Sequence, residues 1–336
     1  MKGIAVVGAG RIGTHHVQAL TQDVRGAQVS ALVDPQRERA QALAERFEIP
    51  TVAADVTEVL DRQDVDAILI ATPVVTHLPI IRAAVKAGKA VFTEKPIGAS
   101  LAEAREAAAL TEEAGVTFQV GFNRRYAESW AAAHELVRSG AVGSIQRYHS
   151  ITRDPGPYGG DPTRTPQGTI FKETLIHDFD TINWFLGDAR PVTVYAAADA
   201  LVAPEARGTG FLDSAVVTIT YDNGAIATAE ASFCAMYGYD LRGEAFGSQG
   251  MVQMGEPTNT ACRSFTADGL RVPTNGTDTS RYHESYVAEF QAFVDRLHGA
   301  TLDHPGAQAG VLAQTIADAC QVSVAEGRVV QMGEVL

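Results

Sequence analysis

The chain has 336 residues, of which 46% are hydrophobic, and this length and composition predict two domains with a packed core in each. Its formal net charge of −13 repels phosphate backbones and anionic lipid surfaces, so neither a nucleic-acid nor a membrane partner is expected. The N-terminal apolar run leads into glycines rather than a signal-peptide cleavage site, and no stretch is long and apolar enough to predict a membrane span.

Cysteine usage indicates the compartment. Cys234, Cys262 and Cys320 are widely scattered and form no CxxC pair, so neither a metal site nor a redox couple is expected. A soluble protein of the reducing cytoplasm is the expectation.

In the first third of the chain, short apolar runs alternate with amphipathic helical patterns. Such an alternation predicts βαβ units and a parallel sheet covered on both faces. The expected strands cover residues 4–7, 28–33, 67–70, 90–93 and 117–120, and the helices between them residues 36–47, 77–87 and 101–114.

Beyond an expected linking helix at residues 126–138, extended segments follow one another with little helix between them. A tight hairpin is indicated at Asp222, Asn223 and Gly224, because Asn and Gly tolerate a positive φ. The pattern predicts a mainly antiparallel sheet. Its strands are expected at residues 145–153, 192–198, 214–221, 225–232, 240–246 and 251–254, and its helices at 173–186, 282–297 and 308–325.

A glycine-rich turn follows the first expected strand and opens a helix. Gly8, Gly10 and Gly13 have the GxGxxG spacing of a dinucleotide site, in which glycines permit a tight turn, close approach of a pyrophosphate, and packing of helix on strand. Within this turn, the cofactor-binding residues are expected to include Arg11 and Ile12 as well.

An acidic residue ends the second expected strand. Asp34 lies 21 residues after Gly13, close to the position of a ribose-binding carboxylate, which would repel a 2′-phosphate and so favours NAD over NADP. Arg37 is a further expected cofactor contact and leaves some use of NADP open. Asp34 could also serve as the N-cap of the helix at residues 36–47, and the two roles are compatible.

Two tripeptides close the fourth and fifth strands of the predicted sheet. Ligands of open α/β sheets bind outside the carboxyl ends of the strands, so both tripeptides are expected at the nicotinamide half of the cofactor. The residues concerned, together with His77 at the start of the next helix, are Ala71, Thr72, Pro73, Glu94, Lys95 and Pro96.

With these motifs in this order, and with Gly-Phe-Asn-Arg-Arg at residues 121–125, the chain resembles the glucose-fructose oxidoreductase and inositol dehydrogenase (Gfo/Idh/MocA) family. Within it the chain is most similar to inositol 2-dehydrogenases. The resemblance extends over the second half, through the segment from Glu173 to Asp180 and through Tyr237 to Asp240. It implies an α/β fold, with a Rossmann domain at residues 1–122 and an α+β domain with a large, mainly antiparallel open sheet at 123–336. This division leaves open that the C-terminal helix packs back on the Rossmann domain.

The resemblance also implies a catalytic group, carried here by Lys95, Glu173 and His177, and a homo-oligomer, either tetramer or dimer. The family usually has aspartate where Glu173 stands, and the extra methylene puts the role of this acid in doubt. The same resemblance adds Asn123, Arg124 and Tyr237 as substrate-binding residues. Asp180, seven residues and two helical turns beyond Glu173, could bind a second hydroxyl of the substrate.

The chemistry of these side chains suits oxidation of an alcohol. Removing a hydride from a carbinol requires that the hydroxyl proton also leaves, and His177 is the expected general base. Glu173 is four residues away, hence on the same face of an expected helix, and could orient the imidazole. Lys95 would stabilise the developing alkoxide. We therefore expect an NAD-dependent dehydrogenase of a polyol, cyclitol or sugar.

Two alternatives stay open. One keeps the chemistry but takes an amino sugar or sugar phosphate, oxidised at carbon 3, for which Arg147, Arg153 and Arg164 could supply a basic cluster. The other is a non-catalytic, NAD-sensing regulator. In addition, His15 and His16 are expected to be packing or solvent residues, and one tyrosine of the alternating pair Tyr237 and Tyr239 is expected in a core or a subunit interface.

Overall fold

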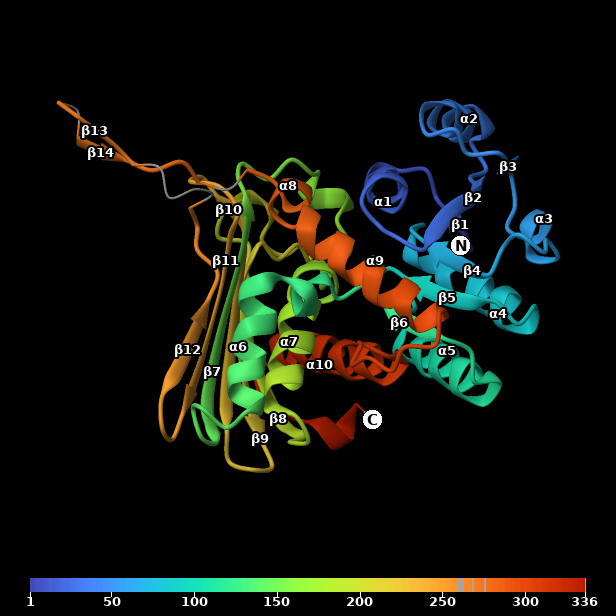
Figure 1. Ribbon diagram of the computed structural model, residues 1–336. Coiled ribbons are helices and arrows are strands. Elements are labelled where there is room, and N and C mark those ends of the chain that lie inside the picture. Colours follow the sequence, from blue (N-terminus) through green and yellow to red (C-terminus); the bar gives the residue numbers. More distant parts are fainter. Residues whose placement is uncertain (259–262, 268, 275, 336) are drawn as a thin grey trace. The chain divides into compact units, whose positions relative to one another are not determined.

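The computed structural model describes residues 1–258, 263–267, 269–274 and 276–335, which form two compact units (Figure 1). The first unit combines Met1–Tyr126 with His283–Leu312, and the second combines Ala127–Tyr282 with Ala313–Leu336. The division predicted from sequence, 1–122 and 123–336, differs in assigning residues 123–126 and 283–312 to the second domain. The predicted domain boundary stays a prediction.

The first unit contains a parallel sheet with the strand order β3-β2-β1-β4-β5-β6. The central strands are buried on both faces, and Ile4, Ile68 and Phe92 are inaccessible to solvent, as expected of a sheet covered by helices. The predicted parallel sheet is therefore confirmed. Its strands are β1 (Lys2–Val7), β2 (Ala27–Val33), β3 (Val52–Ala53), β4 (Ala67–Ile70), β5 (Ala90–Thr93) and β6 (Phe118–Val120).

Helices of the first unit follow the apolar periodicity of the sequence. α5 illustrates the local signals: Ser100 caps it by accepting the Glu103 amide, and Gly115 ends it with a positive φ of 62°. The helices are α1 (Arg11–Gln22), α2 (Arg37–Arg46), α3 (Thr57–Leu60), α4 (His77–Lys86), α5 (Leu101–Ala114) and α9 (His283–Leu297), with short 3-10 turns η1 (Val74–Thr76) and η2 (Asn123–Tyr126).

The second unit is built on a mixed sheet with the order β12-β11-β7-β10-β9-β8-β15. Only β7 and β10 pair in parallel among its described strands, so the predicted mainly antiparallel sheet is confirmed. The predicted turn at Gly224 has φ 86° and joins β9 to β10. The strands are β7 (Ile145–Pro155), β8 (Pro191–Asp199), β9 (Ser214–Tyr221), β10 (Ile226–Ala235), β11 (Asp240–Gly247), β12 (Met251–Met254) and β15 (Val330–Gln331).

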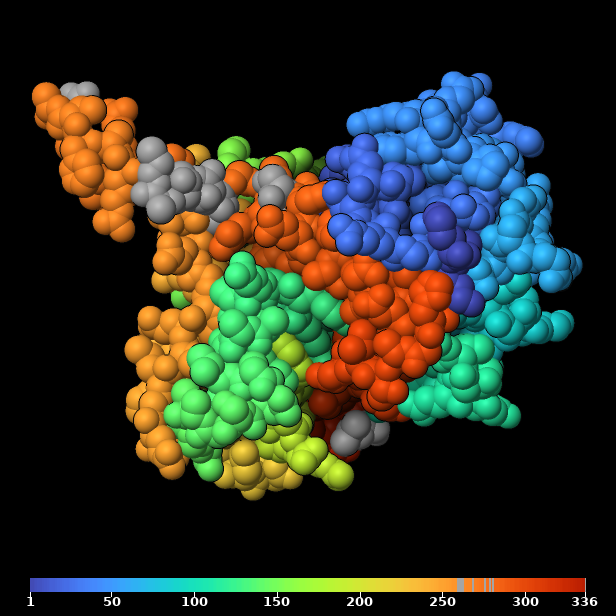
Figure 2. Space-filling model, viewed as in Figure 1, coloured from blue at the N-terminus to red at the C-terminus, as the bar shows by residue number. Residues whose placement is uncertain are grey.

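One face of this sheet is covered by helices (Figure 1). α6 (Glu128–Arg138) buries Trp130 and Ala133, and its outer side, green in Figure 2, is exposed. α7 (Ile176–Leu186) packs on β7, and α10 (Ala307–Glu326) contacts β8, where the Ser323 hydroxyl accepts the Ala196 amide at 2.9 Å. On the other face, large side chains lie open: Val216 is 52% exposed, and Tyr195 and Ile226 are each 44% exposed.

Some described elements differ from the predictions. The helix expected at residues 173–186 begins with a π-helical turn, η4 (Ile170–Thr174), in which the Leu175 amide bonds to the Ile170 carbonyl, and continues as α7. An exposed hairpin of β13 (Ser264–Thr266) and β14 (Gly269–Arg271) precedes the short helix α8 (Asp278–Arg281), and neither was predicted. Cys262 lies outside the described residues. None of the described helices has the length and apolar character needed to span a bilayer.

Candidate cofactor and active site

The three glycines of the turn between β1 and α1 differ in what surrounds them. Gly8 has φ 105°, and a Cβ there would lie 2.3 Å from the Ala71 carbonyl oxygen. A Cβ on Gly13 would lie 1.9 Å from the Gly8 carbonyl oxygen, so this glycine permits the helix to pack on the strand. At Gly10 a Cβ would meet nothing within 4 Å. The open side of the turn is therefore at Gly10, where a pyrophosphate would approach the start of α1.

The first turn of α1 contains the other two residues expected in this loop. Arg11 is exposed and Ile12 is partly exposed, and Gly10 offers no side chain to cap the helix. An anion at this end would meet backbone N–H groups and the positive end of the helix dipole.

Asp34 immediately follows β2 and is 1% exposed. Its Oδ2 atom accepts the Ala9 amide at 2.8 Å and the Arg39 guanidinium at 2.6 Å, while Oδ1 accepts the Gln36 amide at 2.8 Å. Burial alone would raise the pKa of this carboxyl, but the hydrogen bonds from Ala9, Arg39 and Gln36 outweigh it and lower the pKa. A negative charge is thus held beside the glycine turn. Helix α2 itself begins at Arg37 with Gln36 as its N-cap, so the alternative role of Asp34 as the N-cap was wrong.

The arginine near this carboxylate is not the one singled out from the sequence. Arg37 is exposed, and no described ion pair joins it to Asp34. Arg39 forms that pair instead. Arg39 lies five residues after Asp34, in the first turn of α2, and the sequence analysis did not single it out. The expected contact of Arg37 with the cofactor stays a prediction.

Two loops at the carboxyl edge of the sheet hold the remaining cofactor-side residues. Ala71, Thr72 and Pro73 follow β4, and Glu94, Lys95 and Pro96 follow β5. His77 is buried at the start of α4, and its ring nitrogens contact the carbonyl oxygens of both loops. The structure therefore brings the two predicted tripeptides to one edge, joined by His77.

Glu94 is anchored from two sides. Its Oε1 atom is 2.6 Å from His16 Nε2, and a Cβ on Gly121 would lie 3.1 Å from Oε2, so the carboxylate packs against the bare backbone of Gly121. His16 is inaccessible to solvent and its ring centroid lies 4.8 Å from that of Phe290 in α9. His16 is thus a packing residue, as expected, with a polar contact that its apolar helix position did not reveal.

In the second unit, the predicted acid and base lie on consecutive helical segments. Glu173 is exposed in the π-helical turn, and His177 is partly exposed in the first turn of α7. Asp180 is 1% exposed, two residues beyond Asp178. The uniform α-helix assumed for Glu173 and His177 is therefore wrong in its first turn. π-Turns of this kind are frequent at functional sites.

Asp178 is a residue that the sequence reasoning missed. It is inaccessible to solvent, and its carboxylate accepts the Ser150 hydroxyl at 2.5 Å and the Thr152 hydroxyl at 2.8 Å. Because both partners project from β7, this carboxylate fixes α7 on the sheet next to His177. In the sequence, the available signal for this contact was the pair of hydroxyl residues, Ser150 and Thr152, on the inward face of β7.

Tyr237 belongs to a polar network at the end of β7. Its hydroxyl donates to Asp240 at 2.6 Å and accepts from Arg153 at 2.8 Å. Arg153 also pairs with Glu230. Burial and the hydrogen bond to Asp240 both raise the pKa of Tyr237. Tyr239 is 8% exposed and packs edge-on against Tyr282, so it is the core member of the tyrosine pair, as predicted.

The remaining predicted substrate residues belong to the first unit. Asn123 and Arg124 are 5% and 3% exposed in η2, just after β6. Lys95, Asn123 and Arg124 are thus in one unit, and Glu173, His177, Asp180 and Tyr237 are in the other. Their joint action on one substrate remains a proposal.

Two family models match the chain. A family model described as an oxidoreductase family with an NAD-binding Rossmann fold matches residues 2–122, and a model described as the GFO/IDH/MocA C-terminal domain matches residues 130–253. The resemblance stated from the motifs is thereby confirmed.

Individual relatives match over nearly the whole chain. An uncharacterized oxidoreductase, YrbE, of Bacillus subtilis is 36% identical, over 96% of this chain and 94% of the relative. A scyllo-inositol 2-dehydrogenase (NAD(+)) of the same organism is 34% identical, over 87% of this chain and 84% of the relative. The crystal structure of a scyllo-inositol dehydrogenase from Lactobacillus casei, with bound NAD(H) and scyllo-inositol, is 26% identical with a TM-score of 0.93, covering 99% of both chains.

Family models match both parts of the chain, and relatives match it along nearly its whole length. These matches agree with a dinucleotide site at the open glycine turn and the buried Asp34. The chain belongs to the Gfo/Idh/MocA oxidoreductase family, and its first unit is the NAD-binding Rossmann fold of that family.

Proposed function

We propose that the chain is an NAD-dependent dehydrogenase that oxidises a secondary hydroxyl of a cyclitol, such as an inositol, or of a related sugar. The observation that carries the proposal is the buried, ionised Asp34 beside an open glycine turn, in a chain 34% identical to a scyllo-inositol 2-dehydrogenase (NAD(+)). The cyclitol itself is inferred from that relative, because inositols present many hydroxyls and no charge.

In the reaction, NAD supplies the hydride acceptor when bound. His177 accepts the hydroxyl proton, while Lys95 donates a hydrogen bond to the same oxygen and stabilises its developing negative charge. The carbinol thus loses a hydride and a proton and becomes a ketone. Glu173 lies one helical turn before His177 and orients the imidazole. This mechanism requires that Lys95 and His177 meet at one carbinol.

The other hydroxyls of the substrate need both hydrogen-bond donors and hydrogen-bond acceptors as partners. Asn123 and Arg124 supply donors from η2, Asp180 supplies an acceptor from α7, and Tyr237 supplies a phenol. Such a set matches an uncharged polyol, for which orientation depends on several hydrogen bonds rather than on one ion pair.

A sugar phosphate is a weaker candidate. Of the arginines that could form a phosphate site, Arg153 is paired with Glu230 and Asp240, and Arg147 lies over the Phe246 ring at 4.8 Å. Anionic partners on Arg153 reduce the positive charge that it can offer to phosphate. We therefore place uncharged cyclitols and sugars first.

The experiment is a substrate screen. The purified full chain is mixed with NAD and a panel of inositol isomers, sugars, amino sugars and sugar phosphates, and NADH is followed by absorbance. We expect turnover on at least one inositol, and roughly 10²- to 10³-fold slower turnover in a Lys95→Ala variant that still binds NAD in a calorimetric titration. Turnover confined to phosphorylated sugars would replace the proposed substrate. NAD binding without turnover on any compound would favour a regulator.

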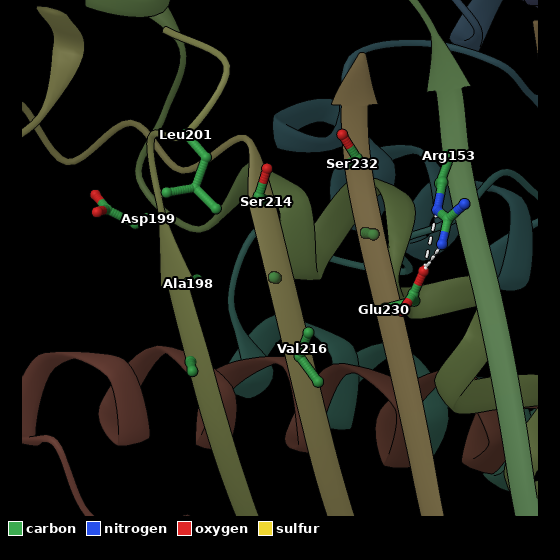
Figure 3. A pocket seen from close by; sticks show the side chains of 11 residues that line it. Arg153, Ala198, Asp199, Leu201, Ser214, Val216, Glu230 and Ser232 are labelled. Atoms are coloured by element: carbon green, nitrogen blue, oxygen red, sulfur yellow. Dashed lines mark hydrogen bonds and ion pairs between the residues drawn. The ribbon is translucent and has the colours of Figure 1, made fainter. Parts of the chain in front are cut away.

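The open face of the second unit's sheet supports a further part of this proposal, a homo-oligomer. A hollow of about 430 Å³ lies over β7 to β10, lined by side chains that include Leu201, Val216 and the Arg153–Glu230 pair (Figure 3). Val216, Tyr195 and Ile226 expose apolar surface on this face. Exposed apolar faces with a few charged groups are typical of association sites. We propose that a second copy covers it, in a dimer or tetramer, and that the enzyme is cytoplasmic, as the scattered cysteines suggest.

A further inference from the structure

His77 has an unusual pair of hydrogen-bond partners. Its Nδ1 atom lies 2.8 Å from the carbonyl oxygen of Pro96, and its Nε2 atom lies 2.9 Å from the carbonyl oxygen of Thr72. The residue is 1% exposed. A backbone carbonyl can only accept a hydrogen bond, and a neutral imidazole has only one N–H. Both contacts are satisfied only when both ring nitrogens carry a proton, which makes the ring an imidazolium.

A third contact agrees with this protonation. The Thr93 hydroxyl oxygen lies 3.4 Å from His77 Nδ1, and the hydroxyl donates its own proton to the Glu94 carbonyl at 3.1 Å. The Thr93 oxygen is therefore an acceptor toward the ring as well. Three oxygen acceptors thus surround the two nitrogens.

A buried cation needs an anion nearby, and Glu94 provides it. Burial would raise the pKa of Glu94, but the hydrogen bond from His16 and the electrostatic effects of His16, Lys95 and His77 lower it. His16 contacts the same carboxylate, with its Nε2 atom 2.6 Å from Glu94 Oε1. The titratable groups near His77 from the loop after β5 and from α1 are then Glu94, Lys95 and His16.

This imidazolium lies between two loops of the first unit. Thr72 belongs to the loop after β4, and Pro96 belongs to the loop after β5, directly following Lys95. One ring therefore ties together the two loops at the edge where the cofactor binds. Pro96 itself has no N–H, so its carbonyl is the only backbone hydrogen-bonding group that it offers.

We propose that His77 is a positioning residue that acts as a buried imidazolium, joining the Thr72 and Pro96 carbonyls and so holding Lys95 at the carboxyl edge of the sheet. The inference rests on the proposed function only where it makes Lys95 the residue that binds the reacting hydroxyl. The charge state of the ring is independent of any substrate.

The first test measures that charge state in the full chain without substrate. Histidine ring nitrogens are labelled with 15N and observed by NMR at about pH 8, where an ordinary histidine with a pKa of about 6.5 is mostly neutral. The His77 signal is assigned by its loss in His77→Gln. We expect both of its nitrogens at imidazolium shifts. His304 is the internal reference, because burial lowers its pKa and it should carry a single proton. A His77 ring with one proton at this pH would overturn the proposal.

The second test separates the two hydrogen bonds. An asparagine amide reaches about as far as Nδ1 of histidine, and a glutamine amide about as far as Nε2. His77→Asn therefore retains a donor toward Pro96, whereas His77→Gln retains one toward Thr72. We expect kcat to fall about tenfold in the Gln variant and less than threefold in the Asn variant, since displacement of about an ångström in a catalytic group is costly. His298→Gln is the matched control, because it makes the same replacement at an exposed ring whose Nε2 atom contacts the Gly26 carbonyl.

The outcomes separate the two proposals. Equal losses of kcat in the Asn and Gln variants, or no loss in either, would overturn the positioning role. If the wild-type chain oxidises no cyclitol or sugar, the proposed function fails, and the NMR measurement still decides whether His77 is an imidazolium. Because that measurement uses the wild-type ring, and either His77 variant can assign its signal, it remains decisive if one of the two variants fails to fold.

Discussion

Replacing Asp34 should change which cofactor the enzyme prefers. In the structure this carboxylate is held by the Ala9 and Gln36 amides and by Arg39, whose Nη2 atom lies 2.6 Å from Oδ2. A hydrogen bond to a charged group contributes about 1.5–3 kcal/mol, which corresponds to roughly a 10- to 150-fold change in affinity. Asp34→Ser removes the acceptor for the ribose hydroxyls and therefore weakens NAD binding by about that factor.

The same substitution should improve the use of NADP. It removes the negative charge that repels a 2′-phosphate and releases Arg39, which can then pair with that phosphate. The ratio of kcat/KM for NAD to that for NADP should fall by about two orders of magnitude. Asp34→Asn is the matched control, because it keeps a side-chain acceptor for Ala9 but has no charge. The double variant Asp34→Ser with Arg39→Gln should lose the gain with NADP and keep the loss with NAD.

The assay is the initial rate of reduction of each cofactor with a saturating substrate, with NAD affinity measured by calorimetry. A pH series adds a check on the electrostatics. Because hydrogen bonds hold the folded-state pKa of Asp34 below its ordinary value of 3.8, the ionised carboxylate stabilises the fold above that pH, and this contribution is lost as the pH falls through the lower folded-state value. An unchanged cofactor ratio in Asp34→Ser would refute the ribose contact.

Three further substitutions test the rest of the site. Lys95→Ala should lower kcat roughly 10²- to 10³-fold while leaving the dissociation constant of NAD within about threefold, because the lysine acts on the alkoxide; retained turnover would contradict this role. Asp178→Ala should lower the free energy of unfolding by about 3 kcal/mol in urea titrations, and Asp178→Asn by about 1 kcal/mol, since the amide keeps an acceptor for the buried hydroxyls. Val216→Glu should dissociate the assembly in analytical ultracentrifugation, whereas Leu136→Glu on α6 should not. Equal effects of the two substitutions would exclude the open sheet face as the association site.

Local signals were sufficient for most elements. The expected strands at residues 67–70, 90–93, 214–221 and 251–254 have the observed bounds, as does the helix at 101–114. These segments have a clear periodicity and strong ends, such as the Ser100 cap and Gly115 of α5. The cofactor site was equally accessible, because GxGxxG and an acid at the next strand end are separated by a nearly constant length of chain.

The contacts between distant segments were not accessible in the same way. Arg39 rather than Arg37 reaches Asp34, and His16 meets Glu94 across 78 residues of chain. The π-turn that contains Glu173 was also missed, because an i to i+5 hydrogen bond leaves no mark in an apolar pattern that also fits an α-helix.

By itself, then, the sequence determined the order of the elements, the family and the cofactor end, since these follow from periodicity, from glycines that only a tight turn requires, and from motifs of fixed spacing. Tertiary structure alone decided the partners of the polar side chains. Whether His77 faces a ligand or two carbonyls, and whether Asp178 faces solvent or two hydroxyls, depends on which strands lie beside the helix. A hydrogen bond between residues far apart in the chain forms only after the sheet has aligned their backbones.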